Sequence, residues 1–295
     1  MRGARTIGRG EEGWPRALDL LADPPDFLRV RGGLPRPGER VVAVVGSRTA
    51  GPAGLDQARK IGWVLARAGA WVASGGAVGI DAAAHMGCLE AGGRTVVVLG
   101  GGLDHLYPAE NRELFARIVE SGGGLVSEMD DGRRAAAWSF PRRNRIVAAL
   151  GEATVVVRAG AGSGALLTAG DAARLGQRVW AAGGVPGDEG VGLRALAEAG
   201  ASVFRTVEEL VRGLGLDEGV GTAIEAADPR SLDGEAATLL AALDREPRGA
   251  DEVARRAGVG PAAVLAGLME LELLGLVERR PGRGFARREV GSQGE

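Results

Sequence analysis

The segment FPRRNR, residues 140–145, places three arginines and an aromatic ring directly before the apolar run IVAAL, residues 146–150. A guanidinium group binds phosphate through two parallel hydrogen bonds, and an aromatic ring can stack on a nucleic-acid base. The apolar run predicts a buried helix over 142–150, and the first turn of a helix favours acidic residues over arginines. Because a bound anion would relieve this conflict, the segment predicts a site for a phosphate-bearing ligand.

The predicted helix decides which of these side chains face the ligand. Arg142 and Arg145 lie one turn apart on the same helical face, whereas Arg143 points elsewhere. We therefore expect one or both of Arg142 and Arg145 to contact phosphate, with Phe140 as a stacking ring and Asn144 as a further contact. Arg143 is either structural or an additional contact.

Three glycine-rich loops elsewhere have the composition of phosphate-binding loops. They read VVGSRTAGPAG at residues 44–54, SGGAVGIDAAAH at 74–85 and RAGAGSGALLTAGDA at 158–172. Small residues let backbone N–H groups approach an anion, and a helix that begins beside such a loop adds positive potential. The candidate contacts in these loops are Gly46, Ser47, Arg48, Ser74, Gly75, Gly76, Gly79, Ser163, Gly164 and Thr168.

Asp81 and His85 lie one helical turn apart in the second of these loops. An aspartate at the start of a helix can accept hydrogen bonds from free backbone N–H groups. We interpret Asp81 and His85 as a structural pair that caps this helix. We expect neither a metal ion nor a cofactor in the protein.

The elements that must position the four loops alternate between short β-branched runs and longer segments rich in alanine, leucine and arginine. Strands are expected at 41–45, 70–73, 95–99, 125–127, 154–157, 178–182 and 201–204, and helices near 53–68, 80–91, 109–120, 142–150, 164–175, 192–199 and 206–213. This alternation predicts an α/β fold with a Rossmann-like, doubly wound, mainly parallel sheet. Ligands of such sheets bind beyond the carboxyl ends of the strands, so the loops should converge. Several phosphate sites beside a ring fit a single-stranded nucleic acid.

The chain divides into four parts by composition. Residues 1–40 form a proline-rich lead-in with one short helix near 15–21, and residues 41–213 form the Rossmann-like domain. Residues 214–231 lack periodicity and are interpreted as a linker. Residues 232–288 contain three helical patterns and two short strands, which is typical of a small C-terminal winged-helix domain. The third of these helices has no Arg, Lys, Asn or Gln to read base edges, which favours a protein contact or a regulatory role.

Composition limits the classes of protein that the chain can belong to. It has 36 basic and 38 acidic residues and a formal net charge of −2. Its longest apolar runs are far shorter than the about 20 residues of a membrane helix, so we expect no membrane association. Cys88 is the only cysteine, which excludes an internal disulfide and suits a reducing cytoplasm. Lys60 is the only lysine, and because genomic base composition explains such an arginine excess, only local clusters of arginine count as evidence.

Seven ordered motifs resemble the family called DprA, Smf or DNA-processing protein A. They are VVGSR, SGGAVGIDAAAH, GGRTVVVLGGGLDHLYPAENREL, LVSE, FPRRNRIVAAL, AGSGALLTAGDA and a G–LRALAEAGA segment, within residues 14–213. The resemblance implies a cytoplasmic, homodimeric, single-stranded DNA-binding protein that is not an enzyme. It also implies that the protein protects incoming strands and helps to load a RecA-type recombinase in natural transformation.

The sequence departs from the family pattern at several positions. Val78 takes the place of an arginine in the second loop, and Arg158 replaces an acidic residue after the fifth strand. Arg194 occupies a position where the family has asparagine, and Gly183-Gly184 replaces the family's Pro-Gly. One positive charge is lost and two are gained, so Arg158 and Arg194 are additional candidate contacts.

Two enzymatic interpretations compete with a binding protein. The run GAGSGA from Gly160 fits a dinucleotide-binding fingerprint, but the acidic residue expected about 20 positions later is absent. The LOG family of phosphoribohydrolases shares this sheet type and carries a Pro-Gly-Gly-x-Gly-Thr-x-x-Glu motif. Glycosidic cleavage needs a carboxylate beside the ribose, and Asp81, Asp104 and Glu128 are the acids that remain for this role.

Overall fold

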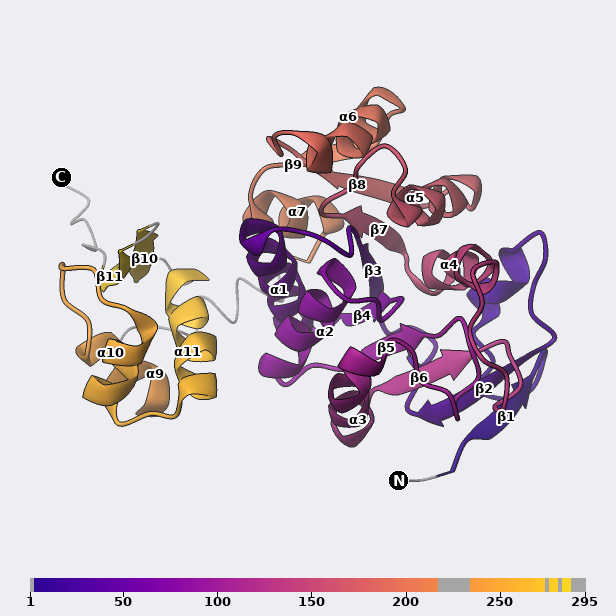
Figure 1. The fold of residues 1–295 in the computed structure, drawn as a ribbon, viewed down its shortest axis with the longest axis horizontal. Coiled ribbons are helices and arrows are strands. Elements are labelled where there is room, and N and C mark those ends of the chain that lie inside the picture. The colour runs from indigo at the N-terminus through magenta and orange to yellow at the C-terminus, as the bar shows by residue number, and fades with distance from the viewer. Residues whose placement is uncertain (1–2, 217–233, 274–275, 281–282, 288–295) are drawn as a thin grey trace. The chain divides into compact units, whose positions relative to one another are not determined.

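The computed structural model describes residues 3–216, 234–273, 276–280 and 283–287. The chain separates into two compact units, Met1–Asp217 and Glu218–Glu295, and each is described by itself. The first unit contains a nine-stranded sheet between helices, and the described residues of the second form three helices and two antiparallel strands (Figure 1). The predicted fold class, a Rossmann-like sheet with a small winged-helix domain, is confirmed.

The sheet of the first unit has the strand order β1-β2-β6-β5-β4-β3-β7-β8-β9. Seven strands pair in parallel: β3 (Val41–Val45), β4 (Trp71–Ser74), β5 (Thr95–Val98), β6 (Gly124–Ser127), β7 (Ala153–Val156), β8 (Arg178–Ala182) and β9 (Ser202–Phe204). Every residue of β3 to β7 is buried, because helices cover both faces of the sheet. These strands lie within one or two residues of the runs predicted from the sequence.

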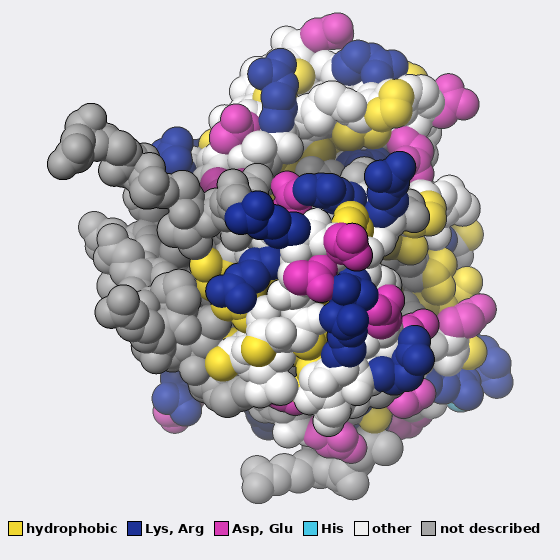
Figure 2. Space-filling view, turned by 90° about the vertical axis from the view of Figure 1, so that its left-hand side faces the viewer, with side chains coloured by type: hydrophobic (Ala, Val, Ile, Leu, Met, Phe, Trp, Pro, Cys, Tyr) yellow, Lys and Arg dark blue, Asp and Glu magenta, His cyan; other side chains and the backbone are white. Residues whose placement is uncertain are grey.

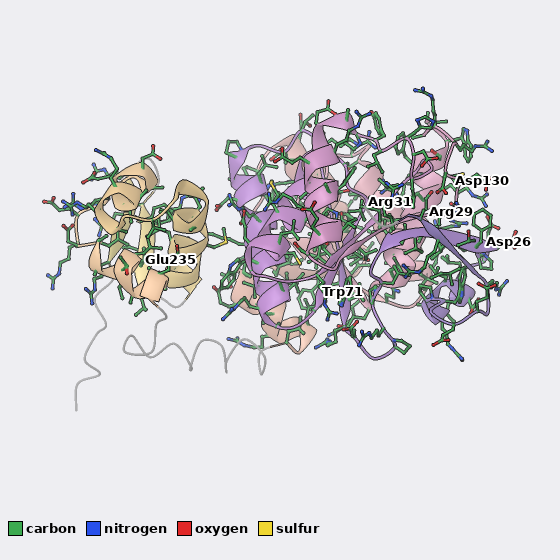
Figure 3. All side chains as sticks on the ribbon, turned by 90° about the horizontal axis from the view of Figure 1, so that it is seen from below. Asp26, Arg29, Arg31, Trp71, Asp130 and Glu235 are labelled. Atoms are coloured by element: carbon green, nitrogen blue, oxygen red, sulfur yellow. The ribbon has the colours of Figure 1, made fainter. Side chains whose placement is uncertain are left out.

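The lead-in adds two strands to this sheet, which the sequence interpretation of residues 1–40 did not include. β1 (Arg5–Gly8) and β2 (Phe27–Gly32) pair antiparallel, and β2 pairs antiparallel with β6. Leu28 and Val30 of β2 are fully buried, while Arg29 and Arg31 project from the other face (Figure 3) and form ion pairs with Asp131 and Asp104. This alternation of apolar and charged residues is the pattern of an antiparallel strand near a sheet edge.

The helices of the first unit form two layers. They are α1 (Pro52–Arg67), α2 (Ile80–Glu90), α3 (Arg112–Glu120), α4 (Ser139–Leu150), α5 (Gly164–Arg174), α6 (Val191–Glu198) and α7 (Val207–Leu214), with short 3-10 turns at Arg16–Leu20, Ala109–Asn111 and Asp188–Gly190. Figure 1 shows α1, α2 and α3 on one side of the sheet and α4 and α5 on the other. Helices α1 and α2 touch through their backbones, since a Cβ atom at Gly62 would lie 2.0 Å from the carbonyl oxygen of Ala84.

The strand order reverses between β3 and β7, and this reversal places the ligand site. From β3 the chain proceeds through β4 and β5 to β6 on one side, then returns through α4 to β7 on the other side. The connections therefore diverge at the carboxyl ends of β3 and β7. A crevice opens at such a switch point in doubly wound sheets, and ligands of this fold class bind there.

The described residues of the second unit form α9 (Gly234–Ala241), α10 (Ala250–Ala257), α11 (Pro261–Leu273) and the antiparallel strands β10 (Val277–Arg280) and β11 (Gly284–Arg287). Its core contains Leu239, Val253, Leu268, Leu271 and Val277. The predicted three helices and hairpin are thus present, whereas the turn residues Pro281-Gly282 lie outside the described residues. The predicted linker, 214–231, lies outside them from residue 217 onward, and Leu214 still belongs to α7.

Charge is mixed in sign on the face that Figure 2 shows. Arginine and acidic side chains lie side by side there, without one large area of a single sign. In the second unit, Arg248 pairs with Asp244 and Glu252, and Arg256 lies near the same two carboxylates. Among the described helices, none is long and apolar enough to cross a membrane.

Candidate functional site

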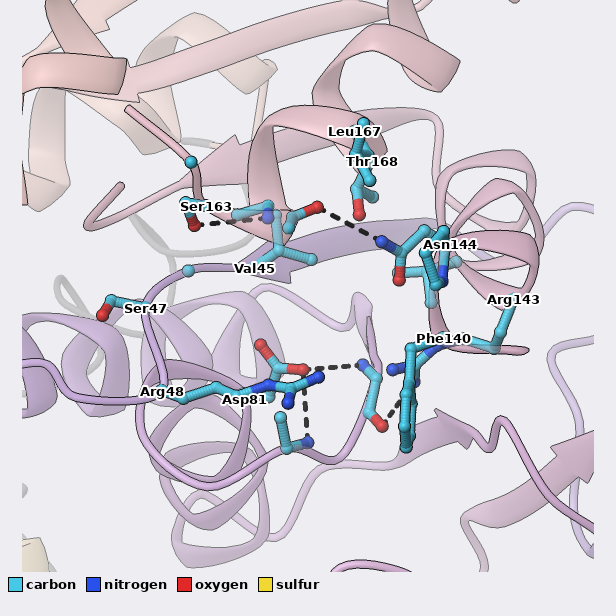
Figure 4. Close-up of a pocket in the computed structure, with 18 of the residues that line it drawn as sticks. Val45, Ser47, Arg48, Asp81, Phe140, Arg143, Asn144, Ser163, Leu167 and Thr168 are labelled. Carbon is cyan, nitrogen blue, oxygen red and sulfur yellow. Dashed lines mark hydrogen bonds between the residues drawn. The ribbon is translucent and has the colours of Figure 1, made fainter. Parts of the chain in front are cut away.

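A pocket of about 720 Å³ lies at the switch point, beyond the carboxyl ends of β3, β4 and β7 (Figure 4). We call it the switch-point pocket. Its wall is formed by four segments: Val45–Arg48 after β3, the loop after β4 with the start of α2, the start of α4, and the loop after β7 with the start of α5. These are the four loops that the sequence singles out, so their predicted convergence is confirmed.

Most of the predicted site residues lie at this pocket, and the others do not. Those that line it are Gly46, Ser47, Arg48, Gly75, Phe140, Arg143, Asn144, Ser163, Gly164 and Thr168. Those that do not line it are Ser74, Gly76, Gly79, Arg142, Arg145, Arg158 and Arg194. We expected Arg48 and one or both of Arg142 and Arg145 to contact phosphate, yet only Arg48 of these three lines the pocket. The geometry of α4 explains why.

Arg142 and Arg145 point away from the pocket toward a buried acid. The Glu128 side chain, 5% exposed, accepts hydrogen bonds from Arg142 Nε at 3.1 Å and from Arg145 Nη2 at 2.7 Å. Asp23 of the lead-in lies 3.2 Å from Arg142. The shared helical face of the two arginines is correctly predicted, but it faces Glu128. Helix α4 also begins at Ser139, three residues before the predicted start, so the arginines lie beyond its first three residues.

Arg143 is instead the arginine of α4 that lines the pocket. Its side chain is buried and donates hydrogen bonds to the carbonyl oxygens of Gly75 and Val98, at the ends of β4 and β5. Burial lowers the pKa of Arg143 to about 10, an effect that the Asp81 carboxylate opposes and the charge of Arg48 reinforces. Because its pKa remains well above neutrality, Arg143 is a buried cation at the pocket wall.

Asp81 carries the negative charge that partly compensates Arg143. Its carboxylate accepts hydrogen bonds from the backbone N–H groups of Gly75 at 3.1 Å and Ala77 at 3.3 Å (Figure 4). Burial raises the pKa of Asp81, and the nearby Arg143 charge opposes this rise. The expected capping pair of Asp81 and His85 is therefore wrong, since these hydrogen bonds hold Asp81 to the loop before α2 and the start of α2 has no side-chain cap.

The start of α2 depends on a glycine and not on a capping side chain. Gly79 is the N-cap residue, with φ of 88° and no side-chain cap. A Cβ atom at this position would lie 2.4 Å from the carbonyl oxygen of Ser47. Gly79 therefore supports the site by letting the loop after β4 approach the loop after β3, and it does not line the pocket.

His85 contacts the hydroxyl of Thr95 and not Asp81. Its Nδ1 lies 2.6 Å from Thr95 Oγ1, which itself donates to the carbonyl oxygen of Val72. Burial and, secondarily, the charge of Arg143 lower the pKa of His85 from 6.5 to about 3. The neutral ring is thus part of the core under α2.

Replacement of His85 by leucine is expected to flatten the acid dependence of stability. The neutral His85 favours the folded state fully above pH 6.5, and this contribution is lost as the pH falls toward 3 because the unfolded chain takes up the proton. The wild-type free energy of unfolding should fall more steeply than that of the variant below pH 6.5, by up to about 1.4 kcal/mol per pH unit. Urea titrations at several pH values measure this difference, and parallel pH profiles would contradict it.

Arg48 is the exposed cation of the pocket. Its guanidinium carbon lies 5.3 Å from the centre of the Phe140 ring, and the two side chains point toward one another across the pocket (Figure 4). Within the described part of the chain, no carboxylate lies within ion-pairing distance of Arg48. A cation stacked on a ring at the mouth of a pocket presents its N–H groups to an incoming anion.

The fourth segment supplies neutral groups to the pocket. Ser163 caps α5 by accepting a hydrogen bond from the Ala165 N–H at 3.3 Å. Asn144 Nδ2 donates to the Gly164 carbonyl oxygen at 3.2 Å and so joins α4 to the start of α5. The Thr168 side chain lies one turn further along α5 and is buried. The start of α5 and the Thr168 hydroxyl thus provide polar groups in the pocket that also contains Arg48 and Arg143.

The remaining predicted residues have structural contacts. The Ser74 hydroxyl donates to the Val44 carbonyl oxygen at 2.6 Å, and Gly76, with φ of 68°, packs against Val97. Arg158 donates to Gln57 at 2.6 Å and lies 3.6 Å from Glu189, while Arg194 is exposed near the Val185 carbonyl. The two arginines gained relative to the family pattern therefore lie away from the pocket wall.

The sequence interpretation missed Tyr107 and Asn111, which belong to the motif LYPAEN. The Tyr107 ring lies 5.6 Å from the Phe140 ring, and Asn111 Nδ2 donates to the Gly76 carbonyl oxygen at 2.9 Å. A tyrosine in a loop at a strand end was the available signal. No group of three or more His, Cys, Asp or Glu side chains in the described ranges could hold a metal ion.

Comparison with known proteins places the chain in a family. Residues 5–215 match the model of DNA recombination-mediator protein A, and residues 223–283 match the DprA winged helix domain. The chain is 35% identical to protein Smf of Escherichia coli strain K12, over 95% of this chain and 76% of that protein. It is 34% identical to protein Smf of Synechocystis, over 93% of this chain and 78% of that protein.

Two solved structures of DNA processing protein A are also similar. The structure from Streptococcus pneumoniae has a TM-score of 0.65 and 31% identity and covers 71% of this chain and 74% of its own. The structure from Helicobacter pylori has a TM-score of 0.65 and 27% identity and covers 72% of this chain and 96% of its own. With both family models matched in order, the chain belongs to the DprA or Smf family of DNA recombination-mediator proteins.

Proposed function

We propose that the switch-point pocket binds single-stranded DNA through its phosphates and through stacking of a base. The observation that carries the proposal is the meeting of two guanidinium groups, Arg48 and Arg143, at a pocket whose wall contains a single carboxylate, Asp81, among the described residues. Two cations thus face one carboxylate, so the pocket holds excess positive charge that an anion would neutralise. The Helicobacter pylori structure concerns a single-stranded DNA binding mode of that relative.

The polar groups of the pocket favour backbone recognition over base recognition. The amide of Asn144 is engaged with the Gly164 carbonyl, and the other polar contributors are N–H groups, hydroxyls and guanidinium groups. Phosphate contacts position a strand without reading its sequence, and stacking on a ring tolerates every base. A duplex, whose bases are paired and stacked, cannot offer a base to Phe140.

The protein should therefore bind single strands in preference to duplex, with little dependence on sequence. Fluorescence anisotropy with labelled single strands of different sequence and with the matching duplex, at several salt concentrations, measures both properties. Affinity for the single strands should fall with added salt as phosphate counterions are released. Equal affinity for single strand and duplex at the same salt concentration would refute the proposal.

The cellular role follows from the family and is part of the same proposal. We infer that the protein acts in the cytoplasm as a homodimer, protects incoming single strands, and helps to load a RecA-type recombinase during transformation and recombination. Sedimentation of the purified protein tests the dimer. Strand exchange by the recombinase on strands already covered by single-strand binding protein tests loading, since a mediator should shorten the lag of that reaction.

The same pocket favours binding over hydrolysis. Of the three acids considered for glycosidic cleavage, Glu128 is paired with Arg142 and Arg145, and Asp104 lies near Arg31 outside the pocket. Asp81 lines the pocket, but its carboxylate is held by two backbone N–H groups beside Arg143. We therefore propose that the protein is not an enzyme. Release of free base from nucleoside monophosphates, abolished by Asp81→Asn, would instead establish the LOG-type activity.

A further inference from the structure

A second, smaller pocket adjoins the first and contains an exposed tyrosine. It measures about 40 Å³ and shares Arg48, Phe140 and Arg143 with the switch-point pocket. Its far wall is Tyr107, whose residue surface is 53% exposed and whose ring lies 5.6 Å from the Phe140 ring at an interplanar angle of 45°. Phe140, which lines both pockets, thus contacts the Tyr107 ring and the Arg48 guanidinium.

The loop that carries Tyr107 is fixed to the loop after β4. Asn111, 8% exposed, donates from Nδ2 to the Gly76 carbonyl oxygen at 2.9 Å, and its own N–H donates to the Pro108 carbonyl oxygen at 3.3 Å. Gly76 adjoins Gly75, which accepts a hydrogen bond from Arg143. The ring is therefore held in place before any ligand arrives, which lowers the entropic cost of stacking on it.

Tyr107 offers a stacking surface that Phe140 lacks in the free protein. Arg48 lies over the Phe140 ring at 5.3 Å, and Tyr107 contacts the same ring, so Phe140 is partly covered. The Tyr107 hydroxyl has no hydrogen-bond partner in the described part of the chain, so no such bond accounts for the exposure of the ring. A half-exposed ring that adjoins a cationic pocket is placed to stack on a base of a strand bound there.

We propose that Tyr107 is a second base-stacking residue, which receives the base adjacent to the nucleotide bound at Phe140. The proposal rests on the single-stranded DNA function proposed above and extends the bound strand by one nucleotide. The two rings are inclined at 45° to each other. Two bases that each stack on one ring therefore cannot lie parallel and stack on each other, as neighbouring bases of a duplex strand do.

A pair of oligonucleotides of equal length, one of thymidines and one of abasic sites, separates stacking from phosphate contact. Both carry the same phosphates, so the dissociation constant of the abasic oligonucleotide divided by that of the thymidine oligonucleotide measures the contribution of the bases. Tyr107→Ala should reduce this ratio at least about fivefold, the lower limit for loss of one stacked base. Tyr107→Phe should keep it, because the ring remains. An unchanged ratio in Tyr107→Ala would overturn the proposal.

Trp138 provides a matched control for the removal of an exposed ring. It is 52% exposed, stacks on Arg133 at 5.4 Å, and lines neither pocket. Trp138→Ala should leave the ratio of the two dissociation constants unchanged. A loss equal to that in Tyr107→Ala would overturn the assignment of stacking to Tyr107. If the wild-type protein binds neither oligonucleotide, the proposed function itself fails, which is a distinct outcome.

A spectroscopic readout is available because Tyr107 is the only tyrosine of the chain. Protein labelled with fluorotyrosine should give one fluorine resonance, and a base stacked on the ring should shift it. We expect a shift with the thymidine oligonucleotide and a much smaller one with the abasic oligonucleotide. Equal shifts with both, or no shift at saturating thymidine oligonucleotide, would overturn the proposal without reference to affinity.

Discussion

Replacement of Arg143 by alanine is expected to destabilise the first unit by about 3–5 kcal/mol, the magnitude found when one of two buried, opposite charges is removed and the other is left uncompensated. The substitution leaves Asp81 buried without its compensating charge, and it leaves the Gly75 and Val98 carbonyl oxygens without a donor. All five tryptophans lie within residues 14–180, so tryptophan fluorescence during urea unfolding reports on this unit alone.

The pH dependence of this loss identifies its cause. Burial raises the pKa of Asp81 and the Arg143 charge opposes this rise, so the carboxyl group of the variant should have a higher pKa than that of the wild type. As the pH falls, Asp81 takes up a proton in the variant first, and the difference in stability between the two proteins should shrink. A difference that does not change between neutral and acidic pH would contradict a charge effect and favour loss of packing.

Arg142→Ala is the matched control for Arg143→Ala, because it removes the same side chain from the neighbouring position of α4. Arg142 is 43% exposed and its partner Glu128 keeps the ion pair with Arg145. Exposed ion pairs contribute about 0–1 kcal/mol, so this variant should be nearly as stable as the wild type. Similar losses in both variants would show that the burial of Arg143 is not what makes it important.

The parallel part of the fold could be predicted from the sequence because its signals are local. The run Val41–Val45 is wholly apolar and the glycine-rich turn that follows ends it, so both its type and its boundaries are encoded in neighbouring residues. β2 was harder to recognise. Its residues alternate between Leu28 or Val30 in the core and Arg29 or Arg31 outside, but the strand is isolated from the regular alternation of strands and helices and pairs with β6, almost a hundred residues away.

The site illustrates a different limit. Four loops at the ends of parallel strands must meet at one edge, so the convergence of Gly46, Gly75 and Ser163 followed from topology alone. Which face of α4 meets them did not follow. Helical spacing correctly separates Arg143 from the pair Arg142 and Arg145. The orientation of the helix, however, depends on the buried side chain of Glu128, which follows β6 and lies outside the pocket.

The identity of the arginine that faces the ligand therefore depends on where the acids are. Glu128 forms ion pairs with Arg142 and Arg145, and the Asp81 carboxylate partly compensates the charge of Arg143. Arg48 has no such partner in the described ranges. Of the two arginines that line the pocket, Arg48 is exposed and Arg143 is buried. Its charge is available to a phosphate without breaking an existing ion pair, which makes it the strongest candidate for a direct contact.

Replacement of Arg48 by alanine is accordingly expected to weaken binding of single-stranded DNA about tenfold or more, the contribution of a hydrogen bond between charged groups. Because the contact is to phosphate, the loss should be similar for all sequences and for the abasic oligonucleotide. The slope of the logarithm of affinity against the logarithm of salt concentration should also decrease in magnitude by about 0.7, the value for one phosphate contact with a single strand.

Arg48→Ala should change affinity without changing stability, which separates it from Arg143→Ala. Arg48 is exposed and contacts Phe140 through its guanidinium face, so its removal leaves no buried group without a partner. Arg142→Ala serves again as the control, since Arg142 is also a partly exposed arginine but lies outside the pocket. If Arg142→Ala reduced the salt slope and Arg48→Ala did not, the strand would follow the Glu128 face of α4, and the switch-point pocket would not be the binding site.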